Sequence, residues 1–390
     1  MKDQQRIELA SGLVLELAAR TGVVGEASPR RYLWTDAFAV MTLIGLQRAT
    51  SDARYGQMAL ALVDQVHRVL GKHRADDVRS GWLSGLSGAE AEAHPTAGGL
   101  RIGKPLGERK PGARFDQELE WERDGQYFHY LTKWMHALDR AAAWTGSREL
   151  SQWSVELARR AHAAFVSGPR RQRHMVWKLS IDLSYPLVAS MGQHDPVDGY
   201  VTCRALERTA TALGGDCYGI ADAAADFATM IDSKRMVSSD PLGIGGLLVD
   251  GCMLVQLDID HHLAAQLLAS AAVGLRQYLR TSELHADAGR RLAFRELGLA
   301  IGLAAVERLA ERGAVDPATR AGLSEVVEVV PLRGRIERFW ARVESRQNRT
   351  WLEHREINEV MLATSLWPDG FLSLGCGDRA DLPASAGAHP

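Results

Sequence analysis

Cysteine is scarce in this 390-residue sequence, and none of its four cysteines forms a CxxC pair. This scarcity disfavours a disulfide framework and a structural zinc site, and it favours buried reduced thiols. The formal net charge is only -2, which gives no field to hold nucleic acid or an anionic membrane. Apolar runs of membrane-spanning length are lacking, and Met1–Ala10 is too polar for a secretory signal. We expect a cytoplasmic monomer or homodimer without nucleic-acid, membrane or metal partners.

What the sequence does contain is hydrophobic periodicity, nearly all of it with the 3.6-residue repeat of helices. Some predicted helices are apolar on several faces and therefore buried, whereas the others carry a charged face. The predicted buried helices begin near residues 32, 124, 176, 241, 291 and 354. The predicted exposed helices cover residues 5–20, 52–71, 148–166, 198–213, 218–231, 260–279, 315–327 and 333–346. No linker interrupts this order, so we predict one all-α domain over residues 1–377 and a flexible tail over 378–390.

Alternation of buried and exposed helices predicts an inner barrel of helices inside an outer one. A helical-repeat solenoid is the competing architecture, and the irregular spacing of the buried helices argues against it. Residues 72–117 lack helical periodicity and are rich in glycine. Loops this long in compact domains are usually functional or disordered. We predict an irregular loop that covers one end of the barrel and holds a short β-hairpin.

The segment 121–134 concentrates acids, aromatics, an imidazole and an amine at the start of a predicted buried helix. On a helix, Gln126, His129, Tyr130 and Lys133 would share one face. Burial of unpaired polar groups costs a few kcal/mol. This polar face therefore predicts a wet cavity, and a hydrogen-bond network without a ligand is the alternative.

The six-and-six helix pattern over residues 5–370 resembles the (α/α)6 barrel of the six-hairpin glycosidases and of the N-acylglucosamine 2-epimerase-like sugar isomerases. The resemblance implies a pocket at one mouth, built from the starts of the inner helices and their preceding loops. It also implies a small-molecule carbohydrate substrate, a reaction without cofactors, and catalysis by carboxylates or histidine.

Several segments at that mouth place an aromatic residue beside a carboxylate, the combination that stacks on sugar rings and binds their hydroxyl groups. The catalytic candidates are Asp36, Glu120, Asp124, His129, Asp182 and His354. The substrate-binding candidates are Trp34, Arg101, Lys104, Gln126, Tyr130, Lys133, Trp177, Lys178, Arg295 and Glu296. The alternatives for Trp34 and Asp36 are a core tryptophan and a helix N-cap, and Asp124 is also a candidate cap.

Glycoside hydrolysis requires one protonated and one ionised carboxyl group, whereas an isomerase requires a base with a pKa near neutrality, such as histidine. This chain resembles the epimerase-like isomerases at His354, which lies near the position of one of their two catalytic histidines. Their second catalytic histidine lies in a segment that corresponds to residues 292–296, and this segment contains no histidine here. We therefore rank a glycoside hydrolase ahead of an isomerase, and a non-catalytic sugar-binding protein third. The basic loop residues Arg101, Lys104, Arg109 and Lys110 favour an anionic sugar, because arginine grips carboxylate or phosphate in two places.

Overall fold

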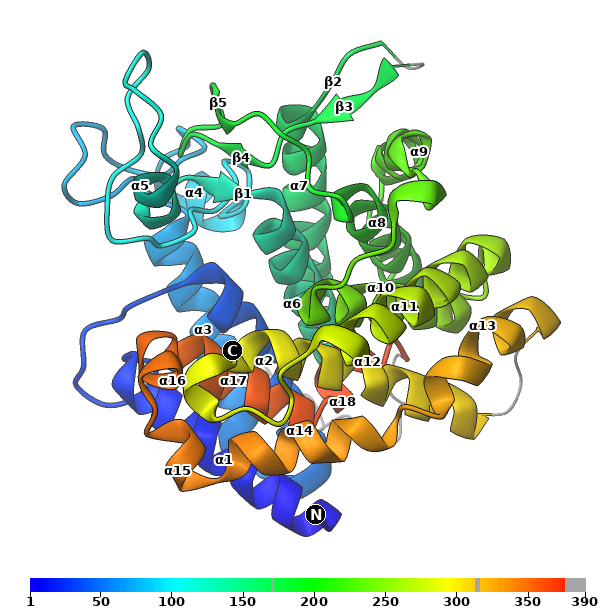
Figure 1. Cartoon of the computed structure of the whole chain (residues 1–390). Coiled ribbons are helices and arrows are strands. Elements are labelled where there is room, and N and C mark those ends of the chain that lie inside the picture. Colours follow the sequence, from blue (N-terminus) through cyan, green and yellow to red (C-terminus); the bar gives the residue numbers. More distant parts are fainter. Residues whose placement is uncertain (170–171, 313–315, 376–390) are drawn as a thin grey trace.

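The computed structural model describes residues 1–169, 172–312 and 316–375, and most of them are helical (Figure 1). Six helices contact one another in chain order, and the last contacts the first, so that they close a ring. These inner helices are α2 (Leu33–Thr50), α6 (Phe128–Thr145), α8 (Asp195–Ala212), α10 (Pro241–Leu257), α12 (Ala293–Arg312) and α17 (Arg355–Leu366). Helix α2 is buried from Leu33 to Leu46 on nearly every side, because it packs against neighbours in both rings.

A second layer of helices packs against the outside of this ring. The outer helices are α1 (Asp3–Arg20) on α17, α3 (Ala53–Leu70) on α2, α7 (Arg148–Phe165) on α6, α9 (Ile220–Met230) on α8, α11 (His261–Thr281) on α10, and both α13 (Pro317–Val327) and α14 (Pro331–Ala341) on α12. The fold is therefore an (α/α)6 barrel, and the closed ring rules out the solenoid.

The prediction of the third inner helix was wrong. Residues 176–190 form two short strands instead of a buried helix, and the inner position is taken by α8, which we predicted as an exposed helix. The apolar residues Trp177, Leu179 and Ile181 alternate with polar ones, and this two-residue period is typical of a strand. Charge in α8 misled the prediction, because the acids at its start face the other inner helices rather than solvent.

Short elements gather at the end of the barrel where the inner helices begin (Figure 1). The strands β1 (Gln126–Tyr127), β4 (Lys178–Leu179) and β5 (Pro186–Val188) form an antiparallel sheet, while β2 (Val166–Ser167) pairs with β3 (His174–Met175). Helices α4 (Gly88–Ala93) and α5 (Gln117–Glu122) flank them. The hairpin predicted within 72–117 was wrong: that loop contains an isolated bridge between Lys72 and Trp82, and the hairpin is β4–β5.

The remaining short elements are η2 (Ser233–Arg235), η3 (Ala288–Arg290), α15 (Val343–Arg346), α16 (Arg349–Glu353) and α18 (Asp369–Leu372). Within the described residues, no helix is both long and apolar enough to cross a lipid bilayer. The predicted tail over 378–390 lies outside the described residues.

Helix α18 packs against α2 and α6, and further contacts join it to the C-terminal ends of α10 and α12, away from the helix starts. His136 of α6 bonds to the carbonyl of Phe371 at 2.8 Å, and Gln256 of α10 donates to the carbonyl of Leu372 at 3.0 Å. Arg308 of α12 forms an ion pair with Asp369. The barrel is therefore covered at this end, and a ligand would enter from the other.

Contact between α18 and α2 depends on glycine. A Cβ atom added to Gly370 would lie 1.8 Å from the carbonyl oxygen of Met41. We expect Gly370→Ala to lower the free energy of unfolding by about 1–3 kcal/mol, because the buried backbones must move apart. Gly12→Ala is the matched control: its Cβ meets nothing within 4 Å, and it should stabilise α1 by about 0.5–1 kcal/mol. Urea unfolding would measure both, and an unchanged stability of Gly370→Ala would contradict this account.

Candidate functional site

Aromatic side chains from three elements form a continuous cluster at the open end of the barrel. We call this cluster the aromatic wall; it consists of Tyr32, Trp34, Tyr127, His129, Tyr130 and Trp177. The hydroxyl groups of Tyr32 and Tyr130 are 2.5 Å apart, and the ring of Trp34 lies 5.2 Å from that of Tyr130. Aromatic faces flanked by hydroxyl groups suit the apolar and polar sides of a sugar ring.

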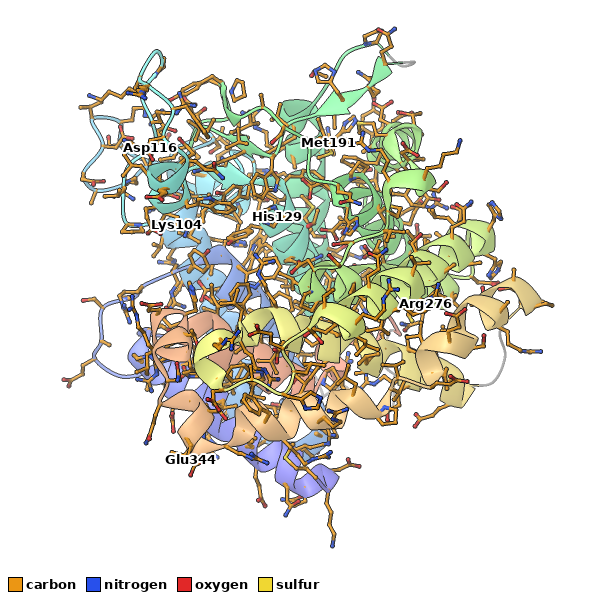
Figure 2. The ribbon with its side chains drawn as sticks, in the orientation of Figure 1. Lys104, Asp116, His129, Met191, Arg276 and Glu344 are labelled. Atoms are coloured by element: carbon orange, nitrogen blue, oxygen red, sulfur yellow. The ribbon has the colours of Figure 1, made fainter. Side chains whose placement is uncertain are left out.

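Pairing of β1 with β4 brings Trp177 to the start of α6. The amide of Phe128 donates to the carbonyl of Trp177 at 3.3 Å, and the Trp177 ring stacks on His129 with centroids 5.6 Å apart. Figure 2 shows His129 at this end of the barrel, with Lys104 in the neighbouring loop. The chain reaches this arrangement only through a strand pairing across about fifty residues, since Gln126 pairs with Leu179.

His129 has a defined protonation state. The indole Nε1 of Trp177 donates to its Nδ1 at 3.0 Å, and an indole N–H only donates. Burial lowers the pKa of His129 to about 4, partly offset by Asp198. The ring is therefore neutral at neutral pH, with its proton on Nε2, where it can donate to a ligand oxygen.

Three aspartates surround Lys133 inside the barrel. Asp198 of α8 accepts hydrogen bonds from Lys133 Nζ at 2.7 Å and from the hydroxyl of Thr132 at 2.5 Å. Burial opposes the charge on Lys133, but Asp198 and Asp250 together raise its pKa.

The other two aspartates favour their protonated forms. Burial, reinforced by repulsion from Asp198, raises the pKa of Asp195 to about 7. The same causes, in the same order, raise the pKa of Asp250 of α10. One turn before Asp250, Gly246 is exposed on an inner helix, and a Cβ atom there would meet nothing within 4 Å. A ligand can therefore approach Asp250 from the barrel interior.

Stability should depend on pH through Asp195. The pKa of Asp195 is higher in the folded state than in the unfolded chain, where it is about 3.9. Its contribution to the free energy of unfolding is therefore fully present below a pH of about 3.9 and is lost as the pH rises through about 7. Asp195→Asn lacks this titration. We expect the unfolding free energy of the native protein, relative to that of the variant, to fall between pH 4 and pH 7 by on the order of a few kcal/mol. The buried histidines change the unfolding free energy with pH in the opposite direction, but they do so equally in both proteins and cancel in the comparison. A difference in unfolding free energy that stays constant between pH 4 and pH 7 would contradict the raised pKa of Asp195.

Three of the predicted site residues, Asp124, Arg101 and Gln126, make their contacts within the fold. Asp124 is fully buried, with Arg101 Nη1 at 2.5 Å and the amides of Gly103 and Gly125 each at 3.0 Å. Gln126 belongs to β1 rather than to the predicted helix face, and its side chain bonds to backbone groups of Gly98, Leu100 and Ile181. The structure therefore places Asp124, Arg101 and Gln126 in the anchoring of the loop 72–117.

The ion pair of Glu120 and Lys178 is also buried beneath the mouth, at 3.0 Å, and Arg109 contacts the second Glu120 oxygen at 3.0 Å. Glu296, in the first turn of α12, is buried between Arg291 and Trp340 of α14.

Other predicted residues lie at helix starts or in loops. Asp36 is buried in the first turn of α2, where it accepts from the amide of Tyr32 at 3.0 Å, and burial raises its pKa to about 7. Asp182 is ion-paired with Arg79 at 2.9 Å. His354 is exposed and lies edge-on to Phe294, with ring centroids 5.6 Å apart. Arg295 forms a 2.5 Å ion pair with Asp240, which joins the starts of α12 and α10.

The sequence interpretation missed Asp195, Asp198 and Asp250. A usable signal existed for Asp250, because it is the only charged residue in the otherwise apolar helix α10. A lone acid in such a helix requires a partner or a wet cavity. Asp198 gave no such signal, since its partner Lys133 lies 65 residues away.

Comparison with known proteins supports the fold. No family model and no curated protein matches the sequence. The structure is similar to that of GH76A, an α-1,6-mannanase of Salegentibacter sp. HEL1_6, with a TM-score of 0.55 and 10% sequence identity. The match covers 93% of this chain and 99% of the mannanase chain. That structure is an inactive variant with two adjacent aspartates replaced by asparagine, in complex with α-1,6-mannotriose.

Proposed function

We propose that this protein is a glycoside hydrolase whose active site lies between the aromatic wall and the aspartates of α8 and α10. The observation that carries the proposal is the pair Asp198 and Asp250 beside Lys133: Asp198 is ion-paired with the Lys133 ammonium at 2.7 Å, whereas burial and repulsion from Asp198 raise the pKa of Asp250. Glycosidic bond cleavage requires such a pair. The neighbouring structure supports a carbohydrate substrate, because a related barrel binds a mannose oligosaccharide.

Each residue then has a role. Asp250, held protonated, donates its proton to the glycosidic oxygen as the bond breaks. Asp198, ion-paired with Lys133, stabilises the positive charge that develops on the sugar, as a nucleophile or by activating water. His129 donates from Nε2 to a sugar oxygen, and the aromatic wall holds the ring. The reaction uses no cofactor in this account.

Two observations refine this assignment. The low pKa of His129 makes it a weak base near neutrality, which disfavours the isomerase hypothesis. The mannanase variant carries its substitutions at two adjacent aspartates, and the one pair of adjacent aspartates in this sequence is Asp76-Asp77. Asp76 is bonded to Arg74 and Asp77 to Arg79 in the loop 72–117, so we assign the catalytic pair to separate inner helices instead.

A product assay tests the proposal. The purified protein would be incubated with α- and β-linked oligosaccharides, mannose oligomers included, and analysed by mass spectrometry. A hydrolase gains water and releases new reducing ends, whereas an isomerase conserves the substrate mass. Saccharide binding without any turnover would replace the proposal with the sugar-binding alternative.

We further propose that Lys104 makes the site selective for an anionic sugar. Its ammonium lies 5.5 Å from the centre of the Tyr32 ring, and burial lowers its pKa. We expect Lys104→Ala to raise the Michaelis constant for a uronic or phosphorylated substrate several-fold, and less so at high salt. Exposed Lys110 in the same loop is the matched control. An equal effect of Lys104→Ala on charged and neutral substrates would argue against charge selection.

A further inference from the structure

A basic hollow of about 230 Å³ lies on the outside of the barrel, between α14 and the loop that joins α11 to α12. Its lining contains four arginines and no acid: Arg291, Arg335, Arg338 and Arg342, with Leu284, Leu332, Ile336 and Phe339 between them. It shares no residue with the aromatic wall or with the aspartates around Lys133.

Helix α14 supplies two of these arginines, and a third, Arg342, is its C-cap residue. Arg335 and Arg338 are three residues apart and share one helix face, and Arg342 follows four residues after Arg338 at the end of the helix. All three are exposed, and among the described residues none has an acid within ion-pair distance. Like charges at this spacing repel one another and destabilise the helix. Neighbouring Arg333, by contrast, pairs with Glu337 at 2.8 Å, so the chain does provide acids for arginines that need them.

The fourth arginine forms a fixed wall of the hollow. Arg291 is buried, binds both oxygens of Glu296 at 2.9 and 2.6 Å, and stacks 3.7 Å from the centre of the Phe339 ring. A third bond reaches the carbonyl of Leu284. These bonds use three of the five N–H groups of a guanidinium, so two remain for another acceptor. Its charge is balanced by Glu296, which leaves Arg335, Arg338 and Arg342 as the net charge of the hollow.

We propose that this hollow binds a phosphate group. Three unneutralised guanidiniums carry more charge than one carboxylate can balance, and a phosphate dianion offers several oxygens to their planar forks. The apolar side chains between the arginines leave room for the organic part of a phosphate ester. The inference is independent of the glycosidase proposal.

Thermal unfolding and calorimetry with inorganic phosphate at pH 8 would test this site, with sodium chloride of equal ionic strength as the reference. We expect phosphate to bind and to raise the melting temperature of the native protein. In the double variant Arg338→Gln, Arg342→Gln the affinity should fall roughly tenfold or more. Without phosphate, that variant should melt slightly higher at low salt, because repulsion along α14 is relieved. Arg235→Gln, an exposed arginine of η2, is the matched control and should respond like the native protein.

Three outcomes would overturn the proposal. The first is a native protein that responds to phosphate no more than to chloride. The second is a double variant that binds phosphate as tightly as the native protein. The third is glucuronate binding as tightly as phosphate, since a carboxylate preference contradicts the charge argument. Sulfate binding equal to that of phosphate would support the site, because the two anions share shape and charge.

Discussion

Asp198→Asn is expected to reduce turnover of a glycosidic substrate by about 10²–10⁴-fold, the range typical of a lost acid–base group. The amide cannot stabilise positive charge or act as a nucleophile. It also leaves Lys133 without its closest carboxylate, at 2.7 Å in the native protein. The repulsion that raises the pKa of Asp250 disappears at the same time, so that pKa should fall. Residual activity should then shift its pH profile toward acid.

Asp226→Asn provides the matched control for this variant. Asp226 is also a buried aspartate with a cationic partner, Arg173 at 2.9 Å, but it lies on the outer helix α9. Both variants should lose stability, whereas only Asp198→Asn should lose activity per folded molecule. Full activity of folded Asp198→Asn, or an unshifted pH profile for its residual activity, would remove Asp198 from the mechanism.

Asp124→Asn is expected to have the largest effect on stability. Its carboxylate is fully buried against Arg101 at 2.5 Å, and it also receives Arg74 at 3.4 Å. Removal of one partner leaves a buried guanidinium unpaired, which costs about 3–5 kcal/mol. The melting temperature should fall by on the order of 10 °C. At temperatures below its melting transition, the folded Asp124→Asn variant should keep its activity, because Asp124 anchors the loop 72–117 and does not touch the aspartates around Lys133.

Asp182→Asn is the control for loop anchoring. Its ion pair with Arg79 is about one-third exposed on both side chains, so solvent screens it and its loss should cost less than about 1 kcal/mol. Calorimetry of both variants, with activity measured at a temperature where both are folded, separates the two roles. Loss of turnover in Asp124→Asn without a change in melting temperature would return Asp124 to the catalytic candidates.

The periodicity of the sequence by itself determined the barrel. Apolar faces repeat locally along each helix, so five of the six inner helices were predicted near their observed starts, at Leu33, Phe128, Pro241, Ala293 and Arg355. The sequence also pointed to the start of α6, because a helix bordered by other helices has no structural need for His129 beside Lys133. Local patterns contain this information because each helix buries its own face.

The tertiary structure alone decided which polar groups meet inside the barrel. Asp124 and Lys133 looked equivalent as polar residues near one helix start, yet their partners lie 23 and 65 residues away, in Arg101 and Asp198. The pair of Asp124 and Arg101 is buried where the loop 72–117 meets the start of β1, whereas the pair of Lys133 and Asp198 faces the barrel interior. The third inner helix was decided in the same way, since an inner helix whose acids face Lys133 carries the charges of an exposed one. A carboxylate takes its role from the groups that the fold brings to it, and sequence periodicity does not record those groups.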